Sequence, residues 1–183
     1  MSVPAEQMDP EVLREQLIAA AAKDKLPIAH LDPTSPWLPD LDSAVNEAIK
    51  RSGKTAENEQ SGIIVRGPDG YAYSIPLTSA RHDDFALRAQ LAKGQSLAAL
   101  WHSHPGNDNL AGYFSPHDLA MADQLKVPSY IRFNSDGSIR SYTPGKTKLQ
   151  SVNTGTGRFD TQKVARGDPI TALPAQLYAE VTK

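Results

Sequence analysis

The sequence contains no cysteine, which excludes a disulfide framework and any metal site built on thiolates. A transition-metal site in this chain must therefore use histidine and carboxylate side chains. No apolar run approaches the length of a transmembrane helix. The first residues, from Met1 to Glu6, have neither the basic start nor the apolar stretch of a signal peptide. We therefore expect a cytoplasmic protein, and export by a route without a cleaved signal remains compatible with the sequence.

An excess of positive charge is also missing. The chain has 19 Lys and Arg against 21 Asp and Glu, with a formal net charge of −2. Because the basic residues are scattered, we predict neither a nucleic-acid partner nor an anionic membrane surface. A phosphate-binding glycine loop and a His-Glu-x-x-His metalloprotease helix are absent as well. The length of 183 residues suits one domain with additional segments.

The spacing of apolar residues predicts helices interleaved with strands. Pro and Gly clusters divide the strands into hairpins, which favours antiparallel pairing and hence a mixed sheet. The order predicts an α/β (α+β) fold in which a mixed β-sheet is flanked by helices. From Thr143 onward we expect irregular structure, apart from residues 176–181. The predicted helices cover residues 9–24, 40–51, 83–93 and 115–125, and the predicted hairpins cover residues 61–75 and 127–142.

The most informative stretch is Trp101-His102-Ser103-His104-Pro105, at the end of an apolar run. If this run is a strand, alternation places His102 and His104 on the same face and Trp101 on the other, in the core. Pro105 cannot donate to a sheet ladder, so the strand should end there. A histidine pair with this spacing is by itself weak evidence for a metal site.

The second informative stretch is Ser115-Pro116-His117-Asp118, which precedes a helical pattern. Ser115 is a typical N-cap, Pro116 a typical first helical residue, and Asp118 the third residue of the helix. A capping arrangement alone would explain this sequence, because an acid in the first turn is favoured by the helix dipole. A carboxylate at a helix start that faces two imidazoles at a strand end would instead give three metal ligands and one open position.

Taken together, His102-Ser103-His104-Pro105 and Ser115-x-x-Asp118 resemble the signature of the JAMM (Jab/MPN-domain) zinc metalloproteases, over about residues 40–142. That family also uses an upstream glutamate, often followed three residues later by glycine. Glu59, three residues before Gly62, fits this placement, and Glu57 is the alternative. The loop 106–114 is longer than expected for the family. The resemblance implies a JAMM/MPN (cytidine-deaminase-like) architecture.

The resemblance also implies a catalytic centre. His102, His104 and Asp118 would hold Zn²⁺ with a water in the fourth position, as in catalytic zinc sites. Glu59 would take a proton from that water and pass it to the leaving amine. Ser115 would donate its hydroxyl to the developing oxyanion. The implied function is hydrolysis of a peptide or isopeptide bond in a peptide or protein substrate, which could be a ubiquitin-like modifier or an effector target.

Other functions remain open from the sequence. The domain could be a binding or scaffold module with little catalysis, a secreted toxin or effector domain, or a zinc amidase or deaminase for a small molecule. His82 could cap a helix or contact substrate, and His117 is expected at a solvated or outer position. We divide the chain into an N-terminal helix with a proline-rich connector (1–39), a JAMM-like catalytic domain (40–145) and a C-terminal extension (146–183). The sequence predicts no oligomeric state.

Overall fold

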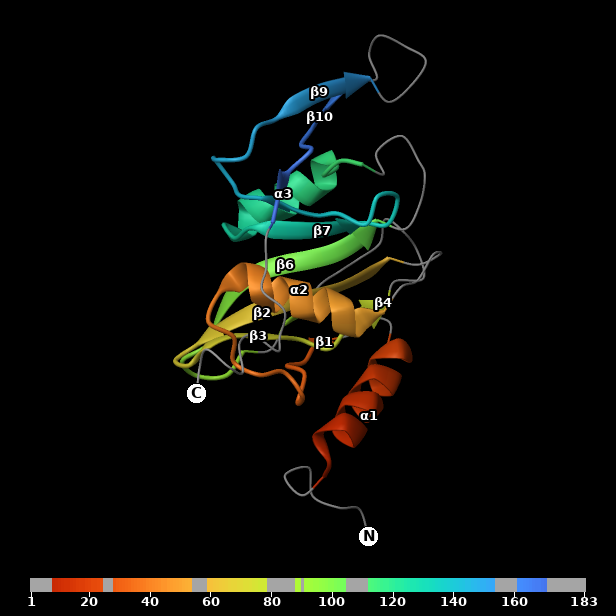
Figure 1. Ribbon diagram of the computed structural model, residues 1–183, viewed down its shortest axis with the longest axis vertical. Helices are drawn as coiled ribbons and strands as arrows, with labels where there is room; N and C mark the ends of the chain where they lie inside the picture. The colour runs from red at the N-terminus through yellow and green to blue at the C-terminus, as the bar shows by residue number, and fades with distance from the viewer. Residues whose placement is uncertain are drawn as a thin grey trace.

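The computed structural model describes residues 8–24, 28–53, 59–78, 88–89, 91–104, 112–153 and 161–170. Within these residues the predicted mixed sheet with flanking helices is confirmed (Figure 1). The elements, in chain order, are α1 (Pro10–Ala22), β1 (Ile28–Ala29), α2 (Leu41–Ser52), β2 (Gln60–Gly67), β3 (Gly70–Tyr73), β4 (Leu77–Thr78), β5 (Arg88–Ala89), β6 (Ser96–His104), α3 (Pro116–Leu125), β7 (Ser129–Phe133), β8 (Ile139–Tyr142), β9 (Gln150–Asn153), β10 (Thr161–Val164) and β11 (Asp168–Pro169).

The main sheet has seven strands among the described residues, in the order β11-β8-β7-β6-β2-β3, with β4 also paired to β2. The pair β6–β7 is parallel, whereas β2–β3, β2–β6 and β7–β8 are antiparallel. β6 is therefore hydrogen-bonded on both sides, to β2 and to β7. The predicted hairpins correspond to β2–β3 and β7–β8. The pair β9–β10 forms a separate hairpin beyond α3 (Figure 1).

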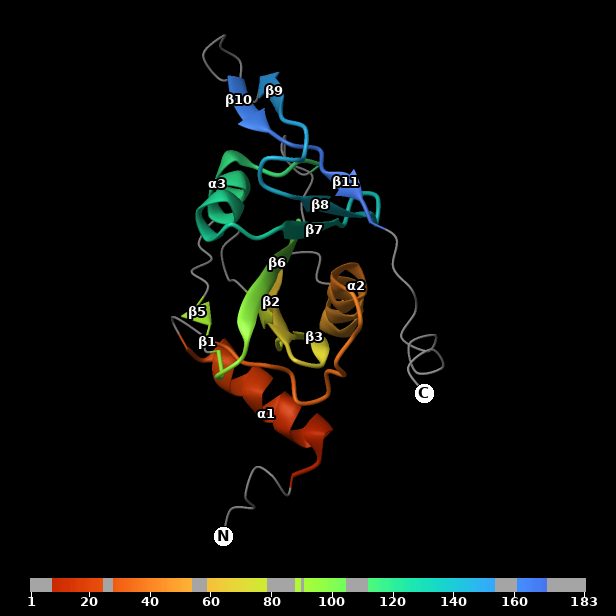
Figure 2. The same ribbon diagram turned by 90° about the vertical axis from the view of Figure 1, so that its left-hand side faces the viewer.

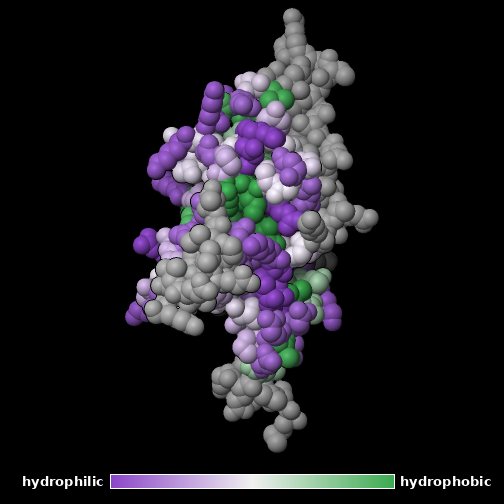
Figure 3. All heavy atoms as spheres, viewed as in Figure 1, coloured by the Kyte–Doolittle hydropathy of each residue, from purple (hydrophilic) through white to green (hydrophobic). Residues whose placement is uncertain are grey.

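Helices cover both faces of the sheet. α2 lies on one face, and α1 and α3 lie on the other (Figure 2). The α2 face buries Trp101, Ile64 and Tyr73 against Val45 and Ile49. α2 turns one apolar side inward and buries Ala44, Val45, Ala48 and Ile49. On this face of the molecule, hydrophilic residues surround a hydrophobic patch near the centre (Figure 3). The arrangement leaves the end of β6 and the start of α3 facing each other on the same side of the sheet.

The helix ends follow the capping signals in the sequence. Asp40 caps α2, where its side chain accepts from the backbone N–H of Ser43 at 2.9 Å. The helix ends at Gly53, which has φ of +76° and so occupies a region that glycine reaches without strain. α1 begins after Asp9 with Pro10 in its first turn. The predicted start and stop of α2 are confirmed.

The described part of the proline-rich connector, residues 28–39, is tied to the sheet. Leu38 is 1% exposed and bonds through its backbone to Tyr71. Asp32, also buried, accepts a hydrogen bond from Arg14 Nε at 2.7 Å and so links the connector to α1. Arg14 also donates to the carbonyl of Arg51 at the end of α2. The N-terminal helix is thereby joined to the rest of the fold by buried polar contacts.

The helix predicted over residues 83–93 is wrong where the structure describes it. Arg88 and Ala89 form β5, which pairs in parallel with Ile28 and Ala29 of β1. Residues 91–93 are not helical either. Backbone pairing with a strand far along the chain overrides the local helical preference here. The rest of that prediction, residues 83–87 and 90, lies outside the described residues.

The irregular structure predicted from Thr143 onward is also wrong in part. β9 and β10 form an antiparallel hairpin, and β11 pairs with β8 and forms the edge of the main sheet. Strands this short gain most of their stability from a partner, so their local sequence gives little indication of them. Residues 176–181 lie outside the described part of the chain. No helix formed by the described residues is long and apolar enough to cross a membrane.

Candidate metal centre

The histidine pair lies at the end of the central strand. His102 and His104 project from the same face of β6, and their Nε2 atoms are 3.2 Å apart. Trp101 points to the opposite face, where it is 1% exposed. The alternation predicted from the sequence is therefore confirmed. Because β6 is paired on both sides, the backbone that carries the two imidazoles is fixed by the sheet.

The start of α3 carries the carboxylate. The backbone N–H of Ser115 donates to Asp118 Oδ2 at 2.8 Å, and the backbone N–H of Asp118 donates to Ser115 Oγ at 3.1 Å. This reciprocal pair is a capping box, and Pro116 is the first helical residue. The capping explanation of this sequence is thus correct as far as it goes. It does not exclude a role for Asp118 as a metal ligand, because the same carboxylate also faces the histidines.

The three predicted ligands converge. Asp118 Oδ1 lies 3.1 Å from His102 Nε2, and Asp118 Oδ2 lies 3.3 Å from His104 Nε2. Metal–ligand bonds of about 2.0–2.1 Å in a tetrahedron place neighbouring ligand atoms about 3.3 Å apart. Each of the three separations is close to this edge length, and the two that involve Asp118 are measured to different oxygens of its carboxylate. Among the described residues, His102, His104 and Asp118 form a group that could hold a metal ion.

Glu59 lies next to this group. Its Oε1 is 3.6 Å from His102 Nε2, and the residue is 9% exposed. It immediately precedes β2, and the first residue of β2, Gln60, is held through both its backbone and its side chain. The backbone N–H of Gln60 donates to Ser103 Oγ at 3.0 Å, and its Nε2 donates to the carbonyl of Ser52 at 3.0 Å. The alternative acid, Glu57, lies outside the described residues.

A side chain would not fit at Gly62, three residues after Glu59. A Cβ atom on Gly62 would lie 2.6 Å from Nε1 of Trp101 and 2.8 Å from Oγ of Ser74. Gly62 pairs with Trp101 across the β2–β6 ladder, and the next pair is Ser61 with His102. The absence of a side chain at Gly62 lets the indole pack against β2. That close packing keeps the register that brings Glu59 to His102.

The charges in the cluster act on one another. Burial lowers the pKa of His102, but the Asp118 carboxylate, with Glu59, more than offsets this and raises that pKa above its ordinary value of 6.5. Burial raises the pKa of Asp118, and the charges and hydrogen bonds of His102 and His104 outweigh it. They hold the pKa of Asp118 well below its ordinary value of 3.8. The carboxylate is therefore ionised, as a metal ligand must be.

Two further features of the site were not predicted. Ser103, which alternates with the histidines, accepts the hydrogen bond that fixes the start of β2. Ser61 is 3% exposed opposite His102, and within the described residues its Oγ has no hydrogen-bond partner. Both residues lie inside the predicted motifs. Their roles depend on the pairing of β2 with β6, which the sequence does not specify.

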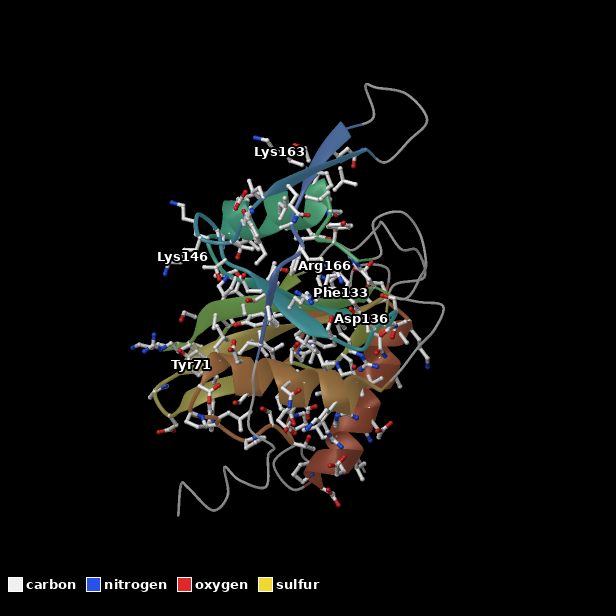
Figure 4. All side chains as sticks on the ribbon, turned by 45° about the horizontal axis from the view of Figure 1, so that its top comes forward. Tyr71, Phe133, Asp136, Lys146, Lys163 and Arg166 are labelled. Carbon is white, nitrogen blue, oxygen red and sulfur yellow. The ribbon has the colours of Figure 1, made fainter. Side chains whose placement is uncertain are left out.

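Aromatic side chains form the wall beside His104. The ring of Phe133, on the neighbouring strand β7, packs edge-on against the His104 ring at 5.5 Å between centroids. Phe114 packs in turn against Phe133 at 6.0 Å. Figure 4 places Phe133 beside Arg166 and Asp136. The wall is apolar on the side of the cluster that faces β7.

His117 is exposed on α3, as expected, and His82 lies outside the described residues.

Comparison with known proteins gives one match. Residues 42–145 match the family model described as prokaryotic homologs of the JAB domain. The match covers more than half of the 183-residue chain and includes Glu59, both histidines, Ser115 and Asp118. The predicted JAMM resemblance is therefore confirmed at the level of the family. No curated protein and no solved structure matches the chain.

Proposed function

We propose that this chain, which belongs to the prokaryotic homologs of the JAB domain, is a zinc-dependent hydrolase of peptide or isopeptide bonds. One observation carries the proposal. The Nε2 atoms of His102 and His104 lie 3.2 Å apart, each lies 3.1–3.3 Å from one oxygen of the Asp118 carboxylate, and a further acidic side chain, Glu59, adjoins them. A capping box alone requires none of the other three residues.

The donor set fits zinc. Two imidazole nitrogens and one carboxylate, with no thiolate, are common zinc ligands, and three protein ligands with an open position are typical of catalytic sites. When bound, zinc supplies a Lewis acid and lowers the pKa of its water toward about 7. His102, His104 and Asp118 would hold the ion. Their preset spacing means that binding requires little rearrangement of the chain.

Glu59 supplies the proton-transfer group. Its Oε1 lies 3.6 Å from Nε2 of His102, so it adjoins the residues that would hold the metal. It would accept a proton at Oε1 and deliver it to the leaving amine, a role that suits a carboxylate fixed near both groups. Gln60, bonded to Ser103 and Ser52, fixes the backbone next to it.

Ser115 supplies a hydrogen-bond donor. Its Oγ accepts from the backbone N–H of Asp118, so the proton of the hydroxyl remains available to a substrate. The carbonyl oxygen of the scissile bond gains negative charge as the nucleophile attacks. A hydroxyl aimed at that oxygen stabilises this charge, typically by a few kcal/mol. The substrate that best suits this set of groups is an amide bond in a peptide or a modified lysine.

Metal binding is tested first. The purified full chain, stripped with a chelator and reloaded in zinc buffer, is expected to carry close to one zinc per chain. His102→Ala and Asp118→Ala should abolish this binding, and the exposed His117→Ala should not. Wild-type protein that stays metal-free in zinc buffer would refute the proposal.

Catalysis is tested with Glu59→Gln. This variant should keep its zinc and lose hydrolysis in a screen of peptide and ubiquitin-like fusion substrates. Glu15→Gln is the matched control, because Glu15 lies on α1, outside the cluster, with a side chain that is 71% exposed. If Glu59→Gln retained the full activity of the zinc-loaded parent, Glu59 would not be the acid–base group. A zinc-loaded parent that cleaves no amide bond would favour the binding or scaffold function.

A further inference from the structure

The segment that leads into α3 is bound by a part of the chain beyond the family match. Phe114 and Ala165 exchange two backbone hydrogen bonds, Phe114 N–H to the Ala165 carbonyl at 2.7 Å and Ala165 N–H to the Phe114 carbonyl at 3.2 Å. Phe114 immediately precedes the capping residue Ser115. The match to the family ends at residue 145. The C-terminal segment therefore contacts the backbone directly before the candidate site.

Arg166 adds side-chain contacts to the same segment. Its Nη1 donates to the carbonyl of Gly112. Its Cζ lies 5.7 Å from the ring centre of Tyr113 and 5.9 Å from that of Phe133. Its Nη2 lies 3.5 Å from Asp136 Oδ2. One guanidinium thus joins the segment before α3 to the aromatic ring that packs on His104 (Figure 4).

These contacts differ in what they contribute. The side chains of Arg166 and Asp136 are 41% and 44% exposed, and an ion pair this exposed contributes little. The hydrogen bond to Gly112 and the two ring contacts are what orient the guanidinium. Gly167 then turns the chain at φ of +82°, and a Cβ there would lie 2.6 Å from Phe114 Cε2. Ala165 and Gly167, the two chain neighbours of Arg166, therefore both lie close to Phe114.

We propose that Arg166 is a positioning residue that holds residues 112–115 against the C-terminal segment and thereby fixes Ser115 and Asp118 opposite the histidines. The consequence for metal binding rests on the proposed function. The consequence for the backbone does not, because the capping box and the Phe114–Ala165 pair exist without a ligand. The functional unit then extends past the family match to at least Gly167.

The first test measures hydrogen exchange of backbone amides in the metal-free full chain. Arg166→Gln should speed exchange at Phe114 and Asp118 at least tenfold and leave the amides of β7 unchanged. Lys163→Gln is the matched control, because it removes the same charge from an exposed position of the same segment, directed away from Arg166 (Figure 4). Arg166→Lys, which keeps a donor and a cation, should show a smaller increase. Equal exchange in Arg166→Gln and Lys163→Gln would overturn the proposal.

The second test measures the site itself. Arg166→Gln should weaken zinc binding about tenfold in a chelator competition and change the visible absorption of the cobalt-substituted protein, which reports coordination geometry. Its midpoint of global unfolding in urea should stay close to that of Lys163→Gln. A loss of global stability that accounts for the weaker binding would assign Arg166 an ordinary structural role and overturn its positioning role. If the wild type binds no zinc, the proposed function fails, and the exchange result still decides the role of Arg166.

A substitution on the other side of the contact gives an independent check. A Cβ on Gly112 would meet the guanidinium of Arg166, and Gly112 has an ordinary backbone conformation. Gly112→Ala should therefore displace Arg166 and reproduce the faster exchange at Phe114 and Asp118. In the double variant Gly112→Ala with Arg166→Gln, the two effects should not add, since both remove one contact. Additive effects would contradict a shared origin.

Discussion

Ser115 and Asp118 bind each other through two reciprocal hydrogen bonds, of 2.8 and 3.1 Å, while the same Asp118 carboxylate faces both imidazoles. Local helix capping and the candidate metal centre therefore share one side chain. The backbone N–H of Ser115 orients the carboxylate before any ion binds. Substitution can separate the two roles, because the cap needs a hydrogen-bond acceptor at residue 118 and the metal site needs a negative charge there.

Asp118→Asn should separate the two roles. The amide oxygen can still accept from the Ser115 backbone N–H, so the loss of the cap should lower the free energy of unfolding by less than about 1 kcal/mol, beside the loss of the charge interaction with the imidazoles. The charge that neutralises a divalent ion is lost, and zinc affinity should drop by orders of magnitude. Asp118→Ala should lose both the cap and the metal. Urea unfolding and zinc titration of the two variants check this, and an Asn variant with wild-type zinc affinity would contradict it.

Ser115→Ala should cost stability and activity together. Removal of the N-cap hydroxyl is expected to lower the free energy of unfolding by about 1 kcal/mol. Asp40→Ala removes the equivalent cap of α2, which lies on the other face of the sheet, and should cost a similar amount. Hydrolysis by the zinc-loaded protein should fall strongly in the first variant alone. Equal activity in both variants would show that Ser115 is only a cap.

Zinc affinity should fall as the pH is lowered. The raised pKa of His102 means that its charged form stabilises the metal-free fold below 6.5 and that this contribution disappears as the pH rises through the raised value. Asp118 contributes in the opposite sense: its stabilisation is present above 3.8 and lost only as the pH falls through its depressed pKa. Between the depressed pKa of Asp118 and the raised pKa of His102, the protonated imidazole of His102 pairs with the Asp118 carboxylate. This ion pair competes with metal binding.

A zinc titration therefore has a defined direction with pH. Because zinc needs the neutral imidazole, apparent affinity should weaken by up to about tenfold per pH unit for each proton displaced, as the pH falls from about 8 to about 6. Proton release on binding, measured in two buffers of different ionisation enthalpy, should rise over the same range. Affinity that is independent of pH would contradict the assignment of His102 as a ligand.

Gly62→Ala should disturb the site through the sheet. A methyl group there would meet the Trp101 indole at 2.6 Å, and overpacking of this kind typically costs about 1–3 kcal/mol. Relief requires β2 to move relative to β6, which shifts Glu59 away from His102. We expect a lower urea midpoint and a larger loss of hydrolysis than of zinc content, because the ligands lie on β6 and α3. Unchanged stability would contradict this account of the glycine.

The buried ion pair of Arg14 with Asp32 should contribute more to the free energy of unfolding than the more exposed pair of Arg51 with Glu11. Arg14→Ala leaves the Asp32 carboxylate, 2% exposed, without its charged partner, which typically costs about 3–5 kcal/mol. Arg51→Ala removes a partly exposed pair with Glu11 and should cost at most about 1 kcal/mol. Thermal or urea unfolding compares the two. Similar losses would indicate that α1 is held mainly by its apolar contacts.

The sequence predicted the local parts of this site well. The shared face of His102 and His104 follows from strand alternation, and the cap at Ser115 follows from the spacing to Asp118. Both depend on neighbours along the chain. Glu59 was placed by family resemblance, and its approach to His102 depends on the register that pairs Ser61 with His102.

The rest depends on partners that are distant in the sequence. β5 is a strand because β1 pairs with it, although its own residues favour a helix. The contact of Ala165 and Arg166 with residues 112–114 brings together segments separated by the whole of α3 and the β7–β8 hairpin. Pairings between remote segments are set by the global packing of the chain, so a local pattern does not indicate them.

The position of β6 has a consequence for how an ion would leave. Its two imidazoles belong to a strand bonded on both sides, whereas the carboxylate belongs to a single turn at the end of a helix. Local opening costs less at a helix end than in the middle of a sheet. A departing ion would part first from Asp118, and a scavenging chelator would approach from the α3 side. The lifetime of the loaded protein would then be limited by fraying of one helical turn, long before the sheet unfolds.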